Sequence, residues 1–416
     1  MPLALLNITP MTYRNIFVDG NLCDISIANG TVSAITPVTE SVLKERFADR
    51  QDFYFAIPGL TNMHTHSAMT LLRSAGSGLP LHRWLNEAIF PREAKLTPKL
   101  IFDGALDACN EMRHTGTTAF NDMYFSIQST VQAACQTGLD ANIALSVTDA
   151  DFEKPELVQS FLETASAVAD NVLSANPQRR ITLSIAPHAI YTVSGKNLKY
   201  LADFAAEHNA LFHIHLSETQ KEREDCISEY GVPPVVYLEK LGVFDKVGAR
   251  FIGAHALWLD STEIQILGSC SASVVHCPNS NLKLGSGYRF LYTELRDAGV
   301  NVCLGTDGCA SSDNLDMIEA MKVMSLLQKG IRNDPSVLPA DEVLRVASTN
   351  GRRALGLPDN AIAIGNVANF SIININNRIF KGIDIINSTS AERQVEFLNR
   401  LIYAGNGSLI AETITQ

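Results

Sequence analysis

From about residue 54 the chain alternates between short apolar runs and amphipathic stretches, and this alternation limits the possible folds more than any other feature. Apolar runs without a polar alternation are typical of parallel strands buried on both faces. The stretches between them, such as residues 99–114, 197–208 and 319–329, have apolar side chains at helical spacing. The predicted strands are residues 54–58, 117–121, 143–147, 181–186, 211–215, 251–254, 273–276 and 301–305.

Eight strand–helix units of this kind predict a (β/α)8 barrel, with residues 58–357 as its domain. The alternative, an open doubly wound sheet, usually has a glycine-rich phosphate turn after its first strand, and this sequence has none there. Residues 1–57 and 358–416 instead have short apolar runs and turns. Asp19-Gly20 and Asn29-Gly30 are typical hairpin turns. We expect both ends of the chain to form one small β-sandwich domain beside the barrel.

Histidines and one aspartate follow several of the predicted strands. In His64-Thr65-His66, the two imidazoles at i and i+2 point to the same side of a strand. The carboxyl ends of parallel barrel strands all meet at one mouth, so these side chains should converge there. Imidazoles and a carboxylate suit Zn²⁺ or Fe²⁺, with a position left for water. The residues expected at this mouth are His64, His66, His188, His215, His255 and Asp307.

Other polar residues near these strand ends have more than one interpretation. Glu218 lies three residues after His215, where its carboxyl group could carry a proton to a substrate nitrogen. His255 could orient an attacking water. His213 is expected to pack behind the metal site. His276 is either a loop anchor or a substrate contact.

Composition limits the partners and the compartment. The net charge of −11 and the absence of a polybasic run argue against a nucleic-acid or anionic-membrane partner. We find no signal peptide and no apolar segment long enough to span a membrane. The eight cysteines are scattered and contain no C-x-x-C, which favours free thiols in a reducing cytoplasm. Cys270, Cys277 and Cys303 are expected to be packing residues rather than zinc ligands.

The motifs, in their order, resemble the amidohydrolase superfamily, in particular the 5′-methylthioadenosine/S-adenosylhomocysteine deaminase group of its cytosine-deaminase-like branch. The resemblance covers about residues 55–357. The matching segments are Pro58-Gly-Leu-Thr-Asn-Met-His-Thr-His66, Leu79-Pro-Leu-His-Arg-Trp84, Glu93-Ala-Lys-Leu-Thr97, Ala186-Pro-His188, His213-Ile-His215-Leu-Ser-Glu218, His276-Cys-Pro-Asn279 and Leu304-Gly-Thr-Asp307.

The resemblance implies one divalent metal, Zn²⁺ with Fe²⁺ as the alternative, and a set of site residues. The implied metal ligands are His64, His66, His215 and Asp307. Glu218 would protonate the ring nitrogen, and His255 and Asp307 would handle the water proton and the leaving ammonia. Glu93 would bind ribose hydroxyls, and Trp84 and His188 would line the nucleoside pocket. Two-metal members have a bridging lysine after strand 4, and the sequence Ala186-Pro-His-Ala-Ile-Tyr191 has none.

One departure from the family pattern concerns the 5′ end of the substrate. Members that use S-adenosylhomocysteine place arginines beyond strand 3 to hold its carboxylate. Here no arginine occurs between Arg113 and Arg179, and the segment contains Asp149, Asp151 and Glu153. A carboxylate without a cationic partner is costly to bury. We therefore expect S-adenosylhomocysteine to be a poorer substrate than a neutral nucleoside, unless a neighbouring subunit supplies the cation.

The function expected from these features is hydrolytic deamination of an adenine nucleoside, with release of ammonia and the inosine analogue. The substrate would be methylthioadenosine, adenosine or a related 5′-substituted adenosine. The alternatives are a deaminase or hydrolase of another heterocycle (guanine, cytosine, a pterin or a triazine), a peptidase- or lactonase-like hydrolase, and a non-catalytic scaffold on the same barrel. We expect a cytoplasmic homo-oligomer.

Overall fold

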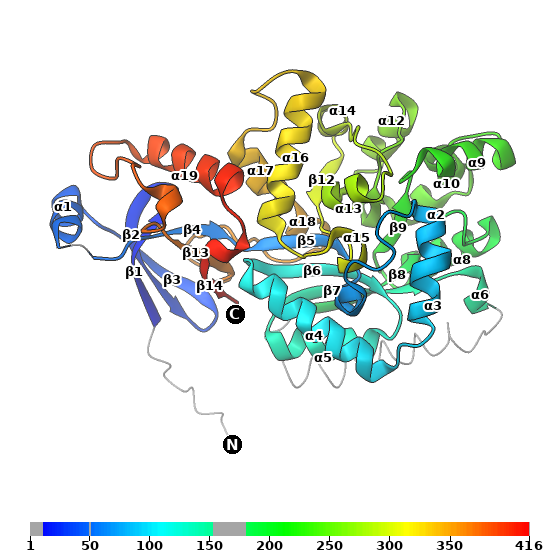
Figure 1. Ribbon diagram of the computed structural model, residues 1–416, viewed down its shortest axis with the longest axis horizontal. Helices are drawn as coiled ribbons and strands as arrows, with labels where there is room; N and C mark the ends of the chain where they lie inside the picture. Colours follow the sequence, from blue (N-terminus) through cyan, green and yellow to red (C-terminus); the bar gives the residue numbers. More distant parts are fainter. Residues whose placement is uncertain (1–10, 50, 153–179, 416) are drawn as a thin grey trace.

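The computed structural model describes residues 11–49, 51–152 and 180–415, and within these residues it contains two β-sheets. One sheet has eight strands and the other has six. Figure 1 shows the six-stranded sheet on the left and the eight-stranded sheet, with its surrounding helices, on the right. Strands from both ends of the chain belong to the six-stranded sheet, as predicted.

The eight-stranded sheet is parallel, and its strands follow the order of the chain. Most of its residues are buried, because helices cover the outer face. This confirms the predicted barrel. Its strands are β5 (Leu60–Thr65), β6 (Thr117–Tyr124), β7 (Asp140–Val147), β8 (Ile181–Pro187), β9 (Phe212–Leu216), β10 (Phe251–His255), β11 (Ser273–His276) and β12 (Asn301–Leu304).

The first and last strands meet around the segment that follows β12. Thr306 N donates a hydrogen bond of 3.0 Å to Asn62 Oδ1, and Asp307 N donates one of 2.9 Å to the His64 carbonyl. A Cβ atom on Gly305 would lie 2.8 Å from His64 N, so this approach requires glycine. The closure brings the polar end of β5 next to Asp307.

The amphipathic stretches are helices, as predicted. Residues 99–114 belong to α4 (Pro98–His114), where Thr97 caps the helix by accepting a hydrogen bond from Leu100 N. Ile101 and Met112 are buried, whereas Leu100 is 41% exposed. Neighbouring residues lie about 100° apart around a helix, and Leu100 lies on the solvent side of the face that Ile101 buries.

Other helices surround the barrel (Figure 1). The expected helix 197–208 corresponds to α8, and 319–329 lies within α16. These helices are α5 (Ile127–Thr137), α8 (Gly195–Glu207), α9 (Gln220–Tyr230), α10 (Pro234–Lys240), α11 (Val243–Val247), α12 (Ser261–Ser269), α13 (Pro278–Lys283), α14 (Tyr292–Asp297), α15 (Cys309–Ser312), α16 (Met317–Arg332), α17 (Ala340–Ala347) and α18 (Thr349–Ala354).

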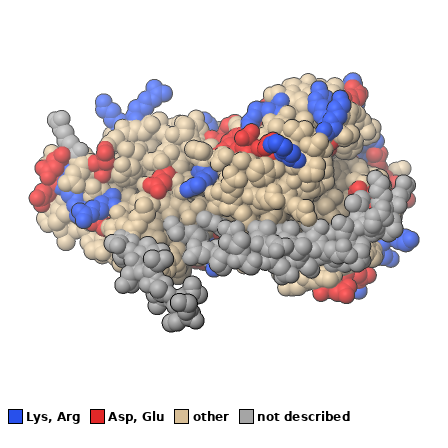
Figure 2. All heavy atoms as spheres, turned by 90° about the horizontal axis from the view of Figure 1, so that it is seen from below, with Lys and Arg blue, Asp and Glu red and all other residues tan. Residues whose placement is uncertain are grey.

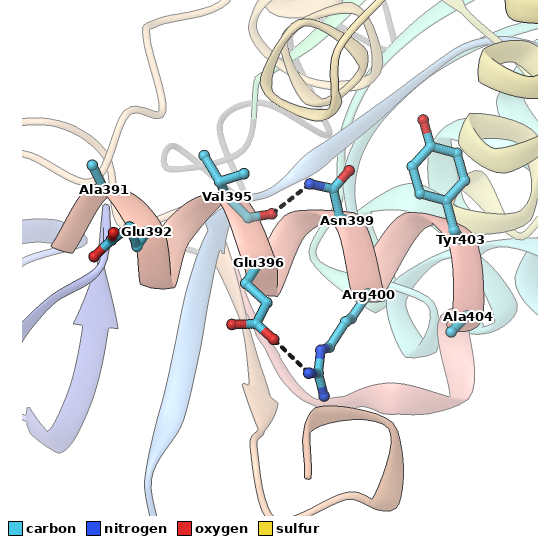
Figure 3. Close-up of a pocket in the computed structure, with 8 residues that line it drawn as sticks. All are labelled: Ala391, Glu392, Val395, Glu396, Asn399, Arg400, Tyr403 and Ala404. Carbon is cyan, nitrogen blue, oxygen red and sulfur yellow. Dashed lines mark hydrogen bonds and ion pairs between the residues drawn. The ribbon is translucent and has the colours of Figure 1, made fainter. Parts of the chain in front are cut away.

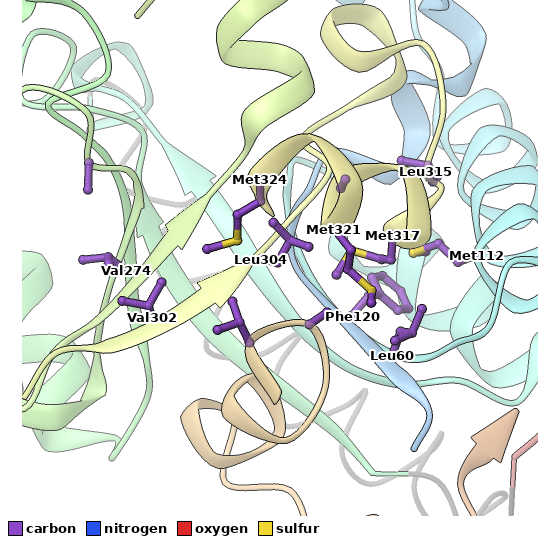
Figure 4. Packing of buried hydrophobic residues seen from close by; sticks show 14 of the residues in the cluster. Leu60, Met112, Phe120, Val274, Val302, Leu304, Leu315, Met317, Met321 and Met324 are labelled. Carbon is purple, nitrogen blue, oxygen red and sulfur yellow. The ribbon is translucent and has the colours of Figure 1, made fainter. Parts of the chain in front are cut away.

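Helix α16 packs on the last strand through unbranched side chains. Met321 and Met324 belong to the same buried cluster as Leu304 of β12 and Phe120 of β6 (Figure 4). Methionine adapts to irregular gaps, so it suits the join between the first and last strands. This packing supports the segment that leads from β12 to Asp307.

The six-stranded sheet has the strand order β14-β13-β4-β1-β2-β3. Both predicted hairpin turns are present. Asp19 and Gly20 have φ of 47° and 71°, and Asn29 and Gly30 have φ of 50° and 74°, as a type I′ turn requires. The strands are β1 (Met11–Val18), β2 (Asn21–Ala28), β3 (Thr31–Pro37), β4 (Tyr54–Pro58), β13 (Phe370–Asn374) and β14 (Ile410–Ile414).

One predicted strand belongs to the other sheet. We assigned residues 54–58 to the barrel, but β4 pairs with β1 and β13 in the six-stranded sheet, and the first barrel strand is β5. The apolar run lies in β4, whereas β5 includes the polar residues Thr61, Asn62, His64 and Thr65, so the apolar pattern does not mark β5 as the barrel strand. Gly59 separates them, and a Cβ atom there would lie 2.2 Å from Thr118 Oγ1.

Two helices accompany the six-stranded sheet, α1 (Glu40–Ala48) and α19 (Ser390–Ala404). Helix α19 packs through Phe397, which stacks on Phe55 at 3.8 Å between ring centroids. Its outer face forms a shallow groove, and Figure 3 shows the side chains that line it. Within this groove Asn399 Nδ2 donates to the Val395 carbonyl, and Arg400 pairs with Glu396.

The surface charge is mixed. On the face in Figure 2, the Lys and Arg side chains among the described residues are interspersed with Asp and Glu and form no continuous basic patch. No helix in the described part of the chain is both long and apolar enough to cross a membrane. Cys277 and Cys303 are buried and Cys270 is partly buried, which agrees with their expected packing role.

Candidate metal centre and substrate pocket

Four side chains from three strand ends converge at the barrel mouth. His64 lies in β5 and His66 follows it, His215 lies in β9, and Asp307 follows β12. Asp307 Oδ1 lies 3.2 Å from His66 Nε2 and 3.5 Å from His64 Nε2. His215 Nε2 lies 3.3 Å from His66 Nε2. His255, at the end of β10, also has a ring nitrogen close to His64 and Asp307. Three imidazoles and a carboxylate in this arrangement can hold one divalent metal.

Neighbouring groups orient the imidazoles toward the centre. His66 Nδ1 contacts the Met123 carbonyl at 2.6 Å, and His215 Nδ1 contacts the His188 carbonyl at 2.8 Å. A carbonyl oxygen only accepts, so each Nδ1 has the hydrogen and each Nε2 presents a lone pair. His64 Nε2 is buried without a hydrogen-bond partner. The donor set therefore fits a metal ion, which would satisfy that nitrogen.

The charges of the cluster favour a cation. Burial lowers the pKa of His64 to about 4 and that of His215 well below its usual value, so both are neutral at pH 7 and free to coordinate. Burial alone would also lower the pKa of His66, but the interaction with Asp307 outweighs it and raises that pKa to about 9, so a cation bound here would replace the Nε2 proton of His66. Burial opposes ionisation of Asp307, yet the neighbouring imidazoles of His66 and His64 hold its pKa well below the usual range.

Two serine hydroxyls and one backbone amide donate hydrogen bonds to the Asp307 carboxylate. Its Oδ2 accepts hydrogen bonds from Ser280 Oγ at 2.6 Å and Ser311 Oγ at 2.9 Å, and its Oδ1 accepts one from Gly308 N at 2.8 Å. Sequence reasoning missed both serines, because they lie in α13 and α15, where no spacing signal marks them. His213, as expected, lies behind the centre, with its Nε2 3.1 Å from His64 Nδ1.

Glu218 is buried beside the centre. Its Oε1 accepts a hydrogen bond of 3.1 Å from Ser286 Oγ, and its Oε2 lies 3.7 Å from His255 Nε2. Burial, and next the negative charge of Asp307, raise the pKa of Glu218 to about 8. The carboxyl group is therefore mostly protonated at pH 7, which is the form that a general acid needs.

Strained backbone accompanies these residues. Ser217, His255 and Asp307 have positive φ values of 46°, 73° and 64°. Residues other than glycine rarely adopt this conformation, which costs on the order of 1–3 kcal/mol each. The surrounding hydrogen bonds hold these residues in place, as is typical of functional sites.

A cavity of about 210 Å³ lies above the centre. Trp84, Glu93 and His188, which we predicted to contact the substrate, line this cavity. The other predicted site residues in its lining are His66, His215, Glu218, His255 and Asp307. Trp84 begins a π-helical segment (Trp84–Ile89), and its Nε1 donates to the Ala75 carbonyl at 2.8 Å. Segments of this kind are frequent at functional sites.

The pocket also contains aromatic residues that the sequence did not indicate. Tyr124 ends β6 beside Glu93, and Tyr191 follows His188. Burial raises the pKa of Glu93 despite the Tyr124 hydroxyl beside it. His276 does not line this pocket in the described structure. It stacks on Phe290 at 4.2 Å between ring centroids, so it is a buried anchor.

Among the described residues of the acidic segment after β7, Asp151 reaches the pocket. Asp151 lines it and accepts hydrogen bonds from Thr148 N and Oγ1 at 2.8 and 2.9 Å. Asp149 instead binds Ser194 and Asn197. The described lining contains no arginine or lysine. Glu153 and Arg179 lie outside the described residues.

Comparisons with known proteins agree with this geometry. The amidohydrolase family matches residues 55–398. The chain is 42% identical over 360 residues to the 5′-deoxyadenosine deaminase of Methanoregula boonei, which covers 86% of this chain and 77% of the relative. It is 40% identical over 357 residues to the 5-methylthioadenosine/S-adenosylhomocysteine deaminase of Thermococcus kodakarensis. This match covers 86% of this chain and 80% of the relative.

A solved structure has the same fold. An adenosine deaminase from Xanthomonas campestris, with bound zinc, aligns with a TM-score of 0.81 at 30% identity, over 94% of this chain and 87% of the other. The sequence match, the barrel and the position of the histidines all support the predicted resemblance. The chain belongs to the amidohydrolase family.

Proposed function

We propose that this protein hydrolytically deaminates an adenine nucleoside. The observation that carries the proposal is the position of Glu218, a protonated carboxylic acid beside a cluster of His64, His66, His215 and Asp307. Relatives with about 40% identity are named 5′-deoxyadenosine deaminase and 5-methylthioadenosine/S-adenosylhomocysteine deaminase, which supports an adenine nucleoside as the substrate.

The proposed metal site takes one divalent ion, with Zn²⁺ the preferred metal and Fe²⁺ the alternative. His64, His66 and His215 would supply nitrogen ligands and Asp307 an oxygen ligand. An ion bound there would lower the pKa of a water molecule toward 7 and so supply the nucleophile. Zinc is bound to the related adenosine deaminase of known structure, and this supports zinc here.

The protein's own residues would move the protons. Glu218 donates its proton to the ring nitrogen N1, which makes the adjacent carbon C6 more electrophilic. Asp307 and His255 accept the proton of the attacking water and return it to the leaving amino group. Ammonia then leaves. The ring keeps the oxygen as the inosine analogue with the proton from Glu218 on N1, and the second proton of the water returns to Glu218. Burial keeps the pKa of His255 low, at about 4, so its ring is neutral before the reaction.

The pocket walls would bind the nucleoside. Glu93 would accept hydrogen bonds from ribose hydroxyls, and Trp84 and His188 would pack against the nucleoside. Toward the 5′ side, Asp151 and the absence of a cation in the described lining favour a neutral 5′ group over a carboxylate. The scattered cysteines, which include no C-x-x-C motif, suit the cytoplasm, and we propose a homo-oligomer there.

The direct test is ammonia release from a substrate panel. Metal-replete protein would be incubated with adenosine, 5′-deoxyadenosine, methylthioadenosine, S-adenosylhomocysteine, guanine and cytosine. We expect turnover of the neutral adenine nucleosides and little turnover of the free bases. Faster turnover of guanine or cytosine would exclude the proposed substrate class. No turnover of any heterocycle would favour the scaffold alternative.

A further inference from the structure

Helix α9 contains one acidic side chain with an unusual environment. Glu222 is 5% exposed, whereas Glu224, two residues further along the same helix, faces solvent. Burying a carboxylate is costly unless its oxygens accept hydrogen bonds. The contacts of Glu222 therefore indicate why it is buried.

Both carboxylate oxygens of Glu222 accept backbone hydrogen bonds from the segment before the helix. Ser217 N donates to Oε1 at 2.8 Å, and Glu218 N donates to Oε2 at 2.7 Å. The Thr219 amide also lies beside the carboxylate. Burial raises the pKa of Glu222 to about 8, although the amides of Glu218 and Ser217 favour the ionised form of this carboxyl group.

The same backbone is held from its other side. The Ser217 carbonyl accepts hydrogen bonds from Leu257 N at 3.1 Å and Trp258 N at 3.0 Å. Ser217 has a φ of 46°, a conformation that a serine does not adopt without external support. Glu222 supplies this support at the amides, and the segment after β10 supplies it at the carbonyl.

We propose that Glu222 is a positioning residue, which fixes the backbone of residues 217–218 and so directs the Glu218 carboxyl group toward the substrate. This inference rests on the role of Glu218 in the proposed function. Glu222 does not line the described pocket, so it acts through Glu218 rather than on the substrate.

The competing interpretation is a purely structural role at the start of the helix. Thr219-Gln-Lys-Glu222 has the spacing of a capping box, and Thr219 Oγ1 does accept a hydrogen bond from Glu222 N. A residue that only starts the helix would affect stability, and its loss would reduce activity by the same factor whatever residue stands at position 218.

A double-mutant cycle separates the two interpretations. Glu222→Gln is made in the wild-type protein and in Glu218→Gln, and kcat/KM is measured for the best nucleoside. Because a glutamine presents one donor to the two amides, we expect a loss of about tenfold to a hundredfold in the wild-type background. In the Glu218→Gln background we expect a loss of less than about threefold, because residues that act as a unit are not additive.

Equal losses in both backgrounds would overturn the proposal. Glu224→Gln is the matched control, because it makes the same change on the exposed face of the same helix, and it should leave kcat/KM unchanged. If Glu222→Gln does not fold, Glu222→Asp replaces it in the same cycle, because it keeps a carboxyl group on a shorter side chain. We again expect a loss of kcat/KM in the wild-type background and little loss in Glu218→Gln.

Hydrogen exchange gives a measurement that does not depend on activity. In Glu222→Gln, peptides that contain the Ser217 and Glu218 amides should lose protection, while peptides from α4 keep theirs. Unchanged protection at residues 217–218 would refute the positioning contact. If Glu218→Gln itself kept full activity, the proposed function would fail, and the exchange experiment would still test the contact.

Discussion

Replacement of Glu218 by glutamine tests the proposed proton donor with little change to the rest of the site. The side chains have nearly the same shape, and glutamine Oε1 can still accept the 3.1 Å hydrogen bond from Ser286. Because the pKa of Glu218 is about 8, the carboxyl group is mostly neutral at pH 7, as an amide is. The charge beside Asp307 therefore hardly changes, and we expect metal content and Tm to stay close to wild type.

Activity should fall sharply, because the amide cannot release a proton to N1. General acid–base catalysis is typically worth about 10²–10⁴-fold, or about 3–5 kcal/mol of activation free energy. The assay is steady-state ammonia release with methylthioadenosine, together with elemental analysis of the same sample. A kcat within a few-fold of wild type, at unchanged metal content, would remove Glu218 from the mechanism.

The wild-type pH profile gives an independent check on the same residue. The pKa of the Glu218 carboxyl is raised to about 8, so the acid form is present below that pH and is lost as pH rises through it. We expect kcat/KM to decline above about pH 8 in the wild type. A profile that stays level to pH 10 would contradict the assignment of Glu218 as the acid.

Further predictions concern the substrate. Methylthioadenosine or adenosine should exceed S-adenosylhomocysteine in kcat/KM by about tenfold to a hundredfold, because one charge-assisted hydrogen bond to the carboxylate is missing; equal rates would mean that an adjoining subunit supplies the cation. Glu93→Ala should reduce kcat/KM for all ribosides alike and spare any activity on free bases. If free bases lost activity equally, Glu93 would support the fold and not the sugar.

The convergence of the histidine side chains was predictable because they come in short motifs at strand ends. His64-Thr65-His66 and His213-Ile-His215 occupy alternate positions of strands, and barrel closure brings both to one mouth. The convergence of these histidines could therefore be predicted without knowing the conformations of the loops. In contrast, Tyr124 and Ser286 reach the site from positions that have no periodic signal, so only the folded chain places them there.

The errors also have physical causes. Strand β4 is apolar and strand β5 is mostly polar, so the apolar pattern marked the wrong strand for the barrel. The change of sheet occurs at Gly59, which looks like any turn residue. The Thr219-to-Glu222 spacing suggests only the start of a helix. The reach of the Glu222 carboxylate to Ser217 and Glu218 depends on the unusual backbone of Ser217, which no local pattern predicts.

We propose that deamination requires a single divalent ion, held by His64, His66, His215 and Asp307. The most direct measurement is elemental analysis combined with turnover, on wild type, on His215→Ala and on chelator-treated wild type reloaded with Zn²⁺ in steps. We predict activity that rises linearly to one ion per chain and then stays constant, with His215→Ala low in both metal and activity. Two ions per active chain, or full activity of His215→Ala, would contradict the account.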